Sequence, residues 1–78
     1  MRLAKQVTAD GTVFDKMENS AQHTNGILLK HISGTVNYGS IGQTAIPLTA
    51  GLAPVLLPTT DTKSLELSGG GVVAVGLF

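Results

Sequence analysis

Two histidines and a nearby serine are the side chains whose types and spacing come nearest to a catalytic arrangement. His23 and His31 are the only imidazoles in the sequence, and Ser33 follows His31 by two residues. In a β-strand this spacing puts both side chains on one face, as a serine nucleophile and its base require. The sequence places no carboxylate to orient either ring, so we interpret His31 as a rim residue of a sheet and His23 as a solvated loop residue. We predict no catalytic residue and no enzymatic activity.

The acidic residues do not form a metal-binding pattern. They lack the alternating Asp and Asn of a calcium loop, and two histidines without cysteine do not supply the four ligands of a structural zinc site. Gly69–Gly71 is followed by neither lysine nor a predicted helix, so we interpret it as a flexible hairpin turn and not as a phosphate-binding loop. We predict no metal and no cofactor. The acidic residues are Asp10, Asp15, Glu18, Asp61 and Glu66, of which Asp61 is expected to cap a short turn.

The composition favours a small protein that associates with other proteins. At 78 residues the chain forms one domain with a modest core, and without cysteine it has no disulfide to reinforce that core. Five basic and five acidic residues give a formal net charge of +0, which provides no basic patch for a nucleic acid. The low charge also removes the repulsion that keeps proteins apart, so we predict a homo-oligomer.

No export signal or membrane segment is predicted. Residues 1–8 contain no apolar run long enough for the core of a signal peptide. The longest apolar stretch, Gly71–Phe78, is much shorter than the roughly 20 residues that span a bilayer, and is typical of a buried strand. We therefore expect no membrane partner.

Short apolar runs alternate with turn residues, which predicts an all-β fold. The last run is rich in valine and would aggregate as a free edge, so we expect it to be central or covered by a neighbouring chain. Pro47 indicates that its strand lies at an edge or is very short. Together the runs predict a small antiparallel β-sandwich or barrel. The predicted strands cover residues 27–32, 35–38, 45–48, 54–58, 64–68 and 72–78.

The first 25 residues are expected to form an extended N-terminal arm, followed by a β-sandwich module of residues 26–78. Asp10-Gly11 is a turn dipeptide between two short runs, Gln6–Thr8 and Thr12–Phe14, which predicts a short hairpin or a bend within the arm. Residues 15–25 are polar, as in a connecting segment or a single helical turn. We expect this arm to reach a neighbouring subunit.

The aromatic residues and the apolar residues near both ends of the chain are candidates for contacts with partners. A strand edge that a neighbour covers is itself an interface, and large side chains near such an edge would anchor it. The predicted interface residues are Phe14, Met17, Tyr38, Val73, Val75 and Phe78.

A pattern of strands and turns runs through residues 26–78. Tyrosine, glycine and a polar turn precede an apolar-Pro-Leu run and a small-Gly pair, and a short turn and two strands follow. Its parts are Gly26–Lys30, Val36–Ser40, Ile46–Gly51, Leu57-Pro58, Asp61–Leu67 and the closing Gly-rich hairpin. The pattern resembles small β-sandwich structural proteins of tailed bacteriophages, in the class of capsid cement, decoration and head-fibre-base modules. Glu66 departs from it, because an aromatic residue is usual there, and residues 1–25 match nothing in the group.

The resemblance implies a virion protein, made in the host cytoplasm, that binds the major capsid protein or another virion protein and stabilises the shell by bridging subunits. An alternative is a tail or adhesin-type module that recognises a surface glycan or receptor. For a glycan the sequence offers Tyr38 with Asn37 and His23. An enzymatic function ranks last, because it would require His31 or the scattered carboxylates to converge in space.

Overall fold

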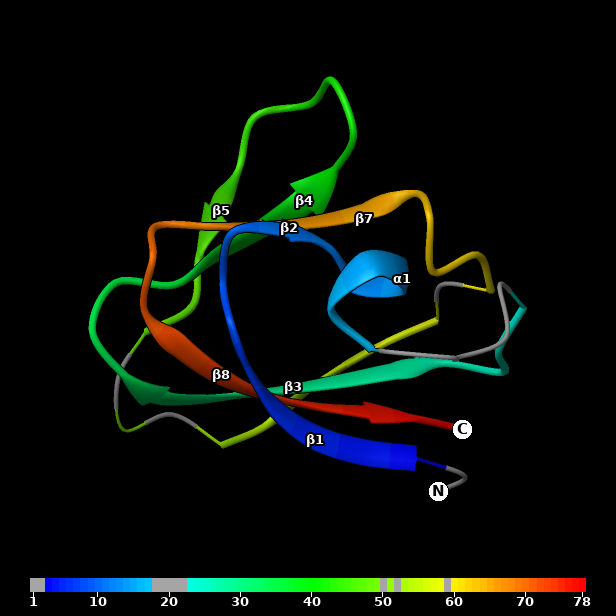
Figure 1. Cartoon of the computed structure of the whole chain (residues 1–78), viewed down its shortest axis with the longest axis horizontal. Coiled ribbons are helices and arrows are strands. Elements are labelled where there is room, and N and C mark those ends of the chain that lie inside the picture. Colours follow the sequence, from blue (N-terminus) through cyan, green and yellow to red (C-terminus); the bar gives the residue numbers. More distant parts are fainter. Residues whose placement is uncertain (1–2, 18–22, 50, 52, 59) are drawn as a thin grey trace.

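The computed structural model shows a small all-β protein built from two antiparallel sheets (Figure 1). It describes residues 3–17, 23–49, 51, 53–58 and 60–78. The all-β, sandwich-like fold predicted from the sequence is confirmed. The elements are β1 (Leu3–Thr8), β2 (Gly11–Thr12), α1 (Val13–Lys16), β3 (Ile27–Ser33), β4 (Asn37–Ser40), β5 (Ile46–Pro47), β6 (Val55–Leu57), β7 (Leu65–Ser68) and β8 (Val72–Leu77).

Four segments of the chain each contribute one strand to each sheet. The strand order is β1-β8-β3-β6 in the first sheet, called sheet A, and β2-β7-β4-β5 in the second, called sheet B. The segments β1–β2, β7–β8, β3–β4 and β5–β6 therefore follow the same order in both sheets. Each segment bends where it passes from one sheet to the other, so the fold is one antiparallel array folded over its own core.

Backbone hydrogen bonds continue across these bends and join the two sheets at a corner. The Ala9 amide donates to the Gly71 carbonyl at 2.8 Å, and the Gly70 amide donates to the Ala9 carbonyl at 3.0 Å. The Gly71 amide donates to the Thr35 carbonyl at 2.8 Å. A Cβ atom on Gly71 would lie 2.5 Å from the Ser33 carbonyl oxygen and 2.6 Å from that of Thr35. Glycine is required at Gly71 because no side chain fits between the crossing backbones.

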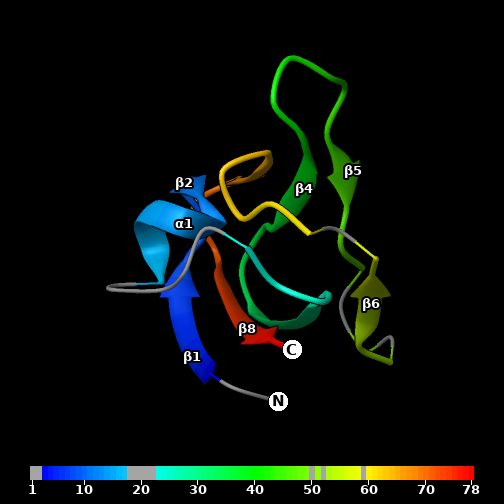
Figure 2. The same cartoon turned by 90° about the vertical axis from the view of Figure 1, so that its right-hand side faces the viewer.

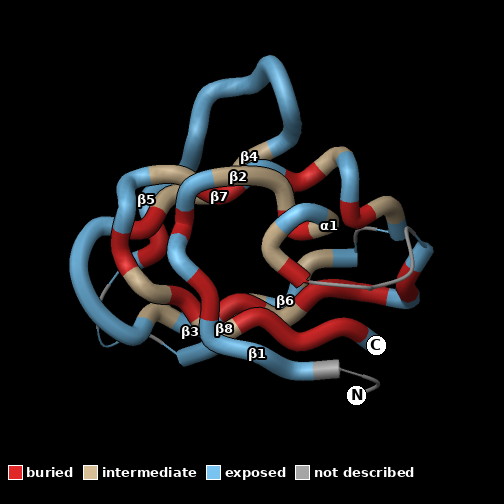
Figure 3. The backbone as a smooth tube through the Cα atoms, viewed as in Figure 1, coloured by how far each residue is buried: buried red, intermediate tan, exposed pale blue. Residues whose placement is uncertain are grey.

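Alternating apolar residues of the central strands form the core between the sheets. Across β3 and β8, Leu29 lies opposite Val75 and Ile27 lies opposite Leu77, so these four side chains share the inner face of sheet A. Figure 3 shows the buried stretches of β3 and β8, and burial of each such side chain stabilises the fold by about 1.5–3 kcal/mol. The buried apolar residues are Val7, Ala9, Val13, Met17, Ile27, Leu29, Val36, Leu48, Leu65, Leu67, Val73, Val75 and Leu77.

The valine-rich last strand is central in sheet A, one of the two arrangements that its sequence predicts. β8 pairs with β1 on one side and with β3 on the other. Two of the edge strands carry or adjoin prolines: β5 contains Pro47, which confirms the predicted edge, and β6 lies between Pro54 and Pro58. Proline has no amide to donate to a further strand, so these edges resist additional pairing.

The extended N-terminal arm is not confirmed. Of the two arrangements predicted around Asp10-Gly11, the hairpin is wrong and the bend is confirmed. β1 pairs with β8 in sheet A, whereas β2 pairs with β7 in sheet B. Asp10-Gly11 therefore belongs to a corner between the sheets, because Ala9 bonds to Gly70 and Gly71 instead of to a hairpin partner. Gly69–Gly71 is likewise a corner and not the predicted hairpin turn, since β7 and β8 lie in different sheets. Residues 18–22 of the predicted arm lie outside the described residues.

Two local predictions shift in position. β4 begins two residues later than the predicted strand over 35–38, because Gly34, with a φ of 68°, and Thr35 form part of the corner. Phe14 lies in α1 and not in a strand. The Thr12 hydroxyl accepts a hydrogen bond from the Asp15 amide at 3.2 Å and caps this single helical turn. The described residues contain no helix that is long and apolar enough to cross a membrane.

Candidate docking surface

His31 contacts the backbone of the corner and not a serine hydroxyl. Its Nε2–H donates to the carbonyl oxygen of Gly34 at 2.6 Å, across the turn that follows β3. Ser33 lies beyond a register shift in the pairing of β3 with β8, so the regular alternation that would place Ser33 beside His31 is interrupted between them. The His31–Gly34 hydrogen bond holds the turn in position, and the register shift separates His31 from Ser33, the two residues of the hypothetical Ser-His pair.

The carboxylates serve local structure. Asp61 caps a turn as predicted, because its Oδ1 accepts a hydrogen bond from the Lys63 amide at 2.9 Å. His23 forms a β-bridge with Asp61. Asp10 pairs with Lys16 across the corner, with 2.5 Å between Oδ1 and Nζ. Among the described residues, no three His, Cys, Asp or Glu side chains gather where they could hold a metal ion, and Glu18 lies outside that part of the chain.

The six predicted interface residues divide into two groups. Met17, Val73 and Val75 have exposed fractions of 0%, 0% and 1%, so within the single chain they are core residues and present no surface to a partner. Tyr38 is half-buried and packs against the core. All three aromatic side chains are at least partly accessible: Phe78 is 37% exposed, and Phe14, like Tyr38, is half-buried. The centre of the Phe14 ring lies 4.7 Å from the Lys63 ammonium.

The residues considered for a glycan site do not converge. Asn37 and Tyr38 are consecutive in β4, so their side chains point to opposite faces of sheet B. Tyr38 lies opposite Leu67 and packs inward, whereas Asn37 lies opposite Ser68. Tyr38 and Asn37 therefore do not form a shared polar surface, and the backbone of His23 pairs with that of Asp61, outside β4.

The side of sheet A that points away from the core, called the outer face, is largely apolar. Ala4 of β1 lies opposite Gly76 of β8, and Leu28 of β3 lies opposite both Gly76 and Leu56 of β6. Side chains that lie opposite one another in a sheet share a face, so these residues form one row across all four strands. Leu56 is 60% exposed. Ala4 is also exposed, Leu28 is half-buried and Gly76 is buried. The exposed apolar surface at Ala4, Leu28 and Leu56 is one that a partner can cover.

A second row beside the first carries Lys30, the one charged side chain that the described strands place on the outer face. Gln6 lies opposite Ala74, and Ala74 lies opposite Lys30. Lys30 is exposed, and no acidic residue belongs to the described strands on this face. Within the described part of the chain, the outer face therefore combines an apolar row with the positive charge of Lys30, in a chain whose formal net charge is +0.

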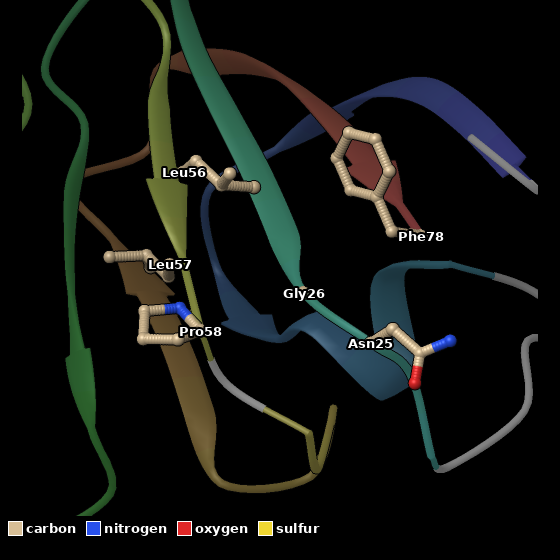
Figure 4. A pocket seen from close by; sticks show the side chains of 6 residues that line it. All are labelled: Asn25, Gly26, Leu56, Leu57, Pro58 and Phe78. Carbon is tan, nitrogen blue, oxygen red and sulfur yellow. The ribbon is translucent and has the colours of Figure 1, made fainter.

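Two hollows lie at separate places on this face. The first, called the central groove, has a volume of about 130 Å³ and lies beside Lys30. The second, called the end pocket, has a volume of about 320 Å³ (Figure 4). The central groove is lined by Ala4, Leu28, Lys30, Pro54, Ala74, Val75 and Gly76. The end pocket is lined by Asn25, Gly26, Leu56, Leu57, Pro58 and Phe78.

Hydrogen bonds to the backbone hold the end pocket in shape. The Asn25 amide donates to the Phe78 carbonyl at 3.0 Å, and the Phe78 amide donates to the Gly26 carbonyl at 3.1 Å. The buried Thr24 hydroxyl contacts the same carbonyl of Phe78 at 2.7 Å. A Cβ on Gly26 would lie 3.6 Å from Leu56 Cδ1, so glycine keeps the floor open between Leu56 and Phe78. Figure 4 shows these two side chains on either side of Gly26.

Comparisons of the chain with protein-family models, curated proteins and solved structures found no significant match. The candidate surface therefore rests on the geometry of this chain.

Sequence reasoning missed most of the outer face, although one signal for it was present. Residues 27–32 have apolar side chains on both faces of the strand, which for a strand of a two-layer protein means that one apolar face points outward. The row that joins Leu28 to Ala4, Gly76 and Leu56 depends on pairing between strands far apart in the chain. That pairing is visible in the structure alone.

Proposed function

We propose that this chain is a non-enzymatic structural module that docks on a larger protein particle through the outer face of sheet A. The observation that carries the proposal is the row of Ala4, Gly76, Leu28 and Leu56, in which Ala4 and Leu56 are exposed and Leu28 is half-buried, so apolar surface of β1, β3 and β6 lies in solvent. The known class that the sequence pattern resembles, capsid cement and decoration proteins, gives the setting: a virion shell to which the module binds and whose subunits it bridges.

The charge of the outer face indicates the chemistry of the docking partner. Lys30 lies at the wall of the central groove, and the described residues on this face contain no carboxylate to neutralise it. A partner surface with an aliphatic side chain beside an Asp or Glu fits both features, because the aliphatic group fills the groove and the carboxylate meets the ammonium. The partner is therefore a shell subunit with an acidic, apolar contact patch.

The outer face is small for a stable protein–protein interface. Four strands about 4.8 Å apart, with residues rising about 3.3 Å each, present roughly 400 Å². A stable interface buries about 800 Å² on each partner. One chain alone therefore binds weakly, and firm attachment requires that neighbouring chains on the particle also contact one another, so that their binding is cooperative.

The test is co-sedimentation of the purified chain with shells assembled from the major shell protein of the particle. The chain should pellet with the shells and saturate at a fixed ratio to their subunits. Lys30→Glu should weaken this binding by about 3- to 10-fold, because it opposes a carboxylate on the partner. Lys63→Glu makes the same change of charge outside the outer face and is the matched control.

Two results would contradict the proposal. The first is a chain that stays in the supernatant at saturating shell concentration. The second is an equal loss of binding in the Lys30→Glu and Lys63→Glu variants, which would indicate attraction by net charge and not a docking surface.

A further inference from the structure

Four of the five large apolar side chains that are exposed among the described residues lie in two separate places. Ile41 and Ile46, 55% and 52% exposed, lie in the hairpin that joins β4 to β5. Leu56 and Phe78, 60% and 37% exposed, flank the end pocket. The fifth is Ile32. One place projects and the other is hollow, so the two differ in shape while sharing an apolar character.

The hairpin of residues 40–46 is a projection with a fixed base. All of its residues are exposed, and none is charged. It rises away from the body of the protein in both Figure 1 and Figure 2, and Figure 3 shows it as a continuous exposed loop. The Ile41 amide donates to the Ser64 carbonyl at 3.0 Å, and the Gln43 amide donates to the Ser40 carbonyl at 2.9 Å. These bonds fix the position of Ile41 before any partner arrives, which lowers the ordering cost of binding.

The end pocket has the size and chemistry to receive this hairpin. A cavity of about 150 Å³ holds one benzene molecule, so a hollow of about 320 Å³ accepts a branched aliphatic side chain together with part of its turn. The pocket lining contains no charged side chain. Because the hairpin also has no charged side chain, their contact would bury none and would not incur the large desolvation cost of a charged side chain.

We propose that the hairpin of one copy of this chain seats in the end pocket of a second copy, with Ile41 as the anchor between Leu56 and Phe78. Within one chain the hairpin between β4 and β5 lies far from the C-terminus in Figures 1 and 2, and Phe78, the last residue, lines the end pocket. The hairpin therefore reaches the pocket of another copy and not its own. The contact is head-to-tail, and repetition of it produces a ring or an open filament. It supplies the contact between neighbouring chains that the small area of the outer face requires on a particle. It covers Leu56 at the β6 end of the outer face and leaves the central groove, with Ala4, Leu28 and Lys30, for docking.

Sedimentation-velocity and light-scattering measurements of the purified chain over a concentration series test this contact. The wild type should show a mass that rises above the monomer with concentration. Ile41→Asp, which changes the hairpin, and Leu56→Asp, which changes the pocket, should each weaken self-association by more than about tenfold. Ile32→Asp introduces the same charge at an exposed apolar site outside both surfaces and should self-associate like the wild type.

Mixing the two defective variants tests whether the hairpin of one copy binds the pocket of another. The Ile41→Asp copy keeps an intact pocket and the Leu56→Asp copy keeps an intact hairpin, so an equimolar mixture should form dimers and nothing larger. A wild type that stays monomeric, or a mixture that stays monomeric while the wild type assembles, would overturn the proposal. Circular dichroism checks that each variant is folded. If Ile41→Asp does not fold, Ile46→Asp replaces it as the hairpin variant. A wild type that is monomeric but still pellets with shells would overturn this contact and leave the docking function standing.

Discussion

The substitution Met17→Ala distinguishes a core residue from an interface residue, the two roles that sequence and structure assign to Met17. Its side chain is 0% exposed and is among the largest fully buried side chains of the described residues. Truncation of a buried methionine to alanine costs about 2–5 kcal/mol, through lost burial and the cavity that remains. The backbone bond from the Met17 amide to the Val13 carbonyl, at 2.9 Å, does not depend on the side chain.

The expected loss is large relative to the stability of so small a domain. A chain of 78 residues is stable by about 4–12 kcal/mol in total. At about 4–8 °C per kcal/mol, a loss of about 3 kcal/mol lowers the melting temperature by roughly 12–24 °C. The assay is thermal unfolding followed by circular dichroism, with urea unfolding as a second measurement of the free energy of unfolding.

Protein concentration separates the two roles in this assay. Truncation of a core residue lowers the melting temperature equally at all protein concentrations. Truncation of an interface residue lowers it only at concentrations where copies associate. Ile41→Ala is the control, since Ile41 is 55% exposed and its truncation should change the free energy of unfolding of the monomer by less than about 0.5 kcal/mol. If dilute Met17→Ala unfolded at the same temperature as Ile41→Ala, the assignment of Met17 to the core would be refuted.

Three further substitutions test the corner, the end pocket and the ion pair. Gly71→Ala should destabilise the protein by several kcal/mol or prevent folding, because its Cβ would overlap the Thr35 carbonyl oxygen; loss of the folded circular dichroism spectrum checks this. Thr24→Val removes a hydroxyl that bonds to the Phe78 carbonyl, so urea unfolding should show a loss of about 1–3 kcal/mol. Asp10→Asn should lower the free energy of unfolding by less than about 1 kcal/mol, because the carboxylate is 57% exposed, and added salt should reduce the difference from wild type.

The sequence was sufficient to predict the local elements whose signals are local. Residues 64–68 alternate between polar and apolar, and residues 27–32 form a short, mainly apolar run; β7 and β3 lie there with Leu67 and Leu29 on the inner faces. Both signals are local, because successive side chains of a strand point to opposite faces whatever the strand pairs with. Pro47 indicated an edge for the same kind of reason, since a missing amide is a property of one residue.

The tertiary structure decided the pairing of strands and, with it, the candidate surface. Asp10-Gly11 and Gly69–Gly71 have the composition of hairpin turns, yet both are corners, because the backbone bonds among Ala9, Gly71 and Thr35 join segments that are distant in the chain. Turn residues permit a change of direction without specifying the partner strand.

The two hollows and the hairpin show the same division. The sequence shows that Leu28 is apolar. It belongs to a docking row only because β3 lies between β8 and β6, which bring Gly76 and Leu56 beside it. Met17 is apolar in the same way and lies in the core. Apolar character determined that such side chains are buried or bind a partner; only the packing of distant strands decided which, because burial depends on what else occupies the space around a side chain.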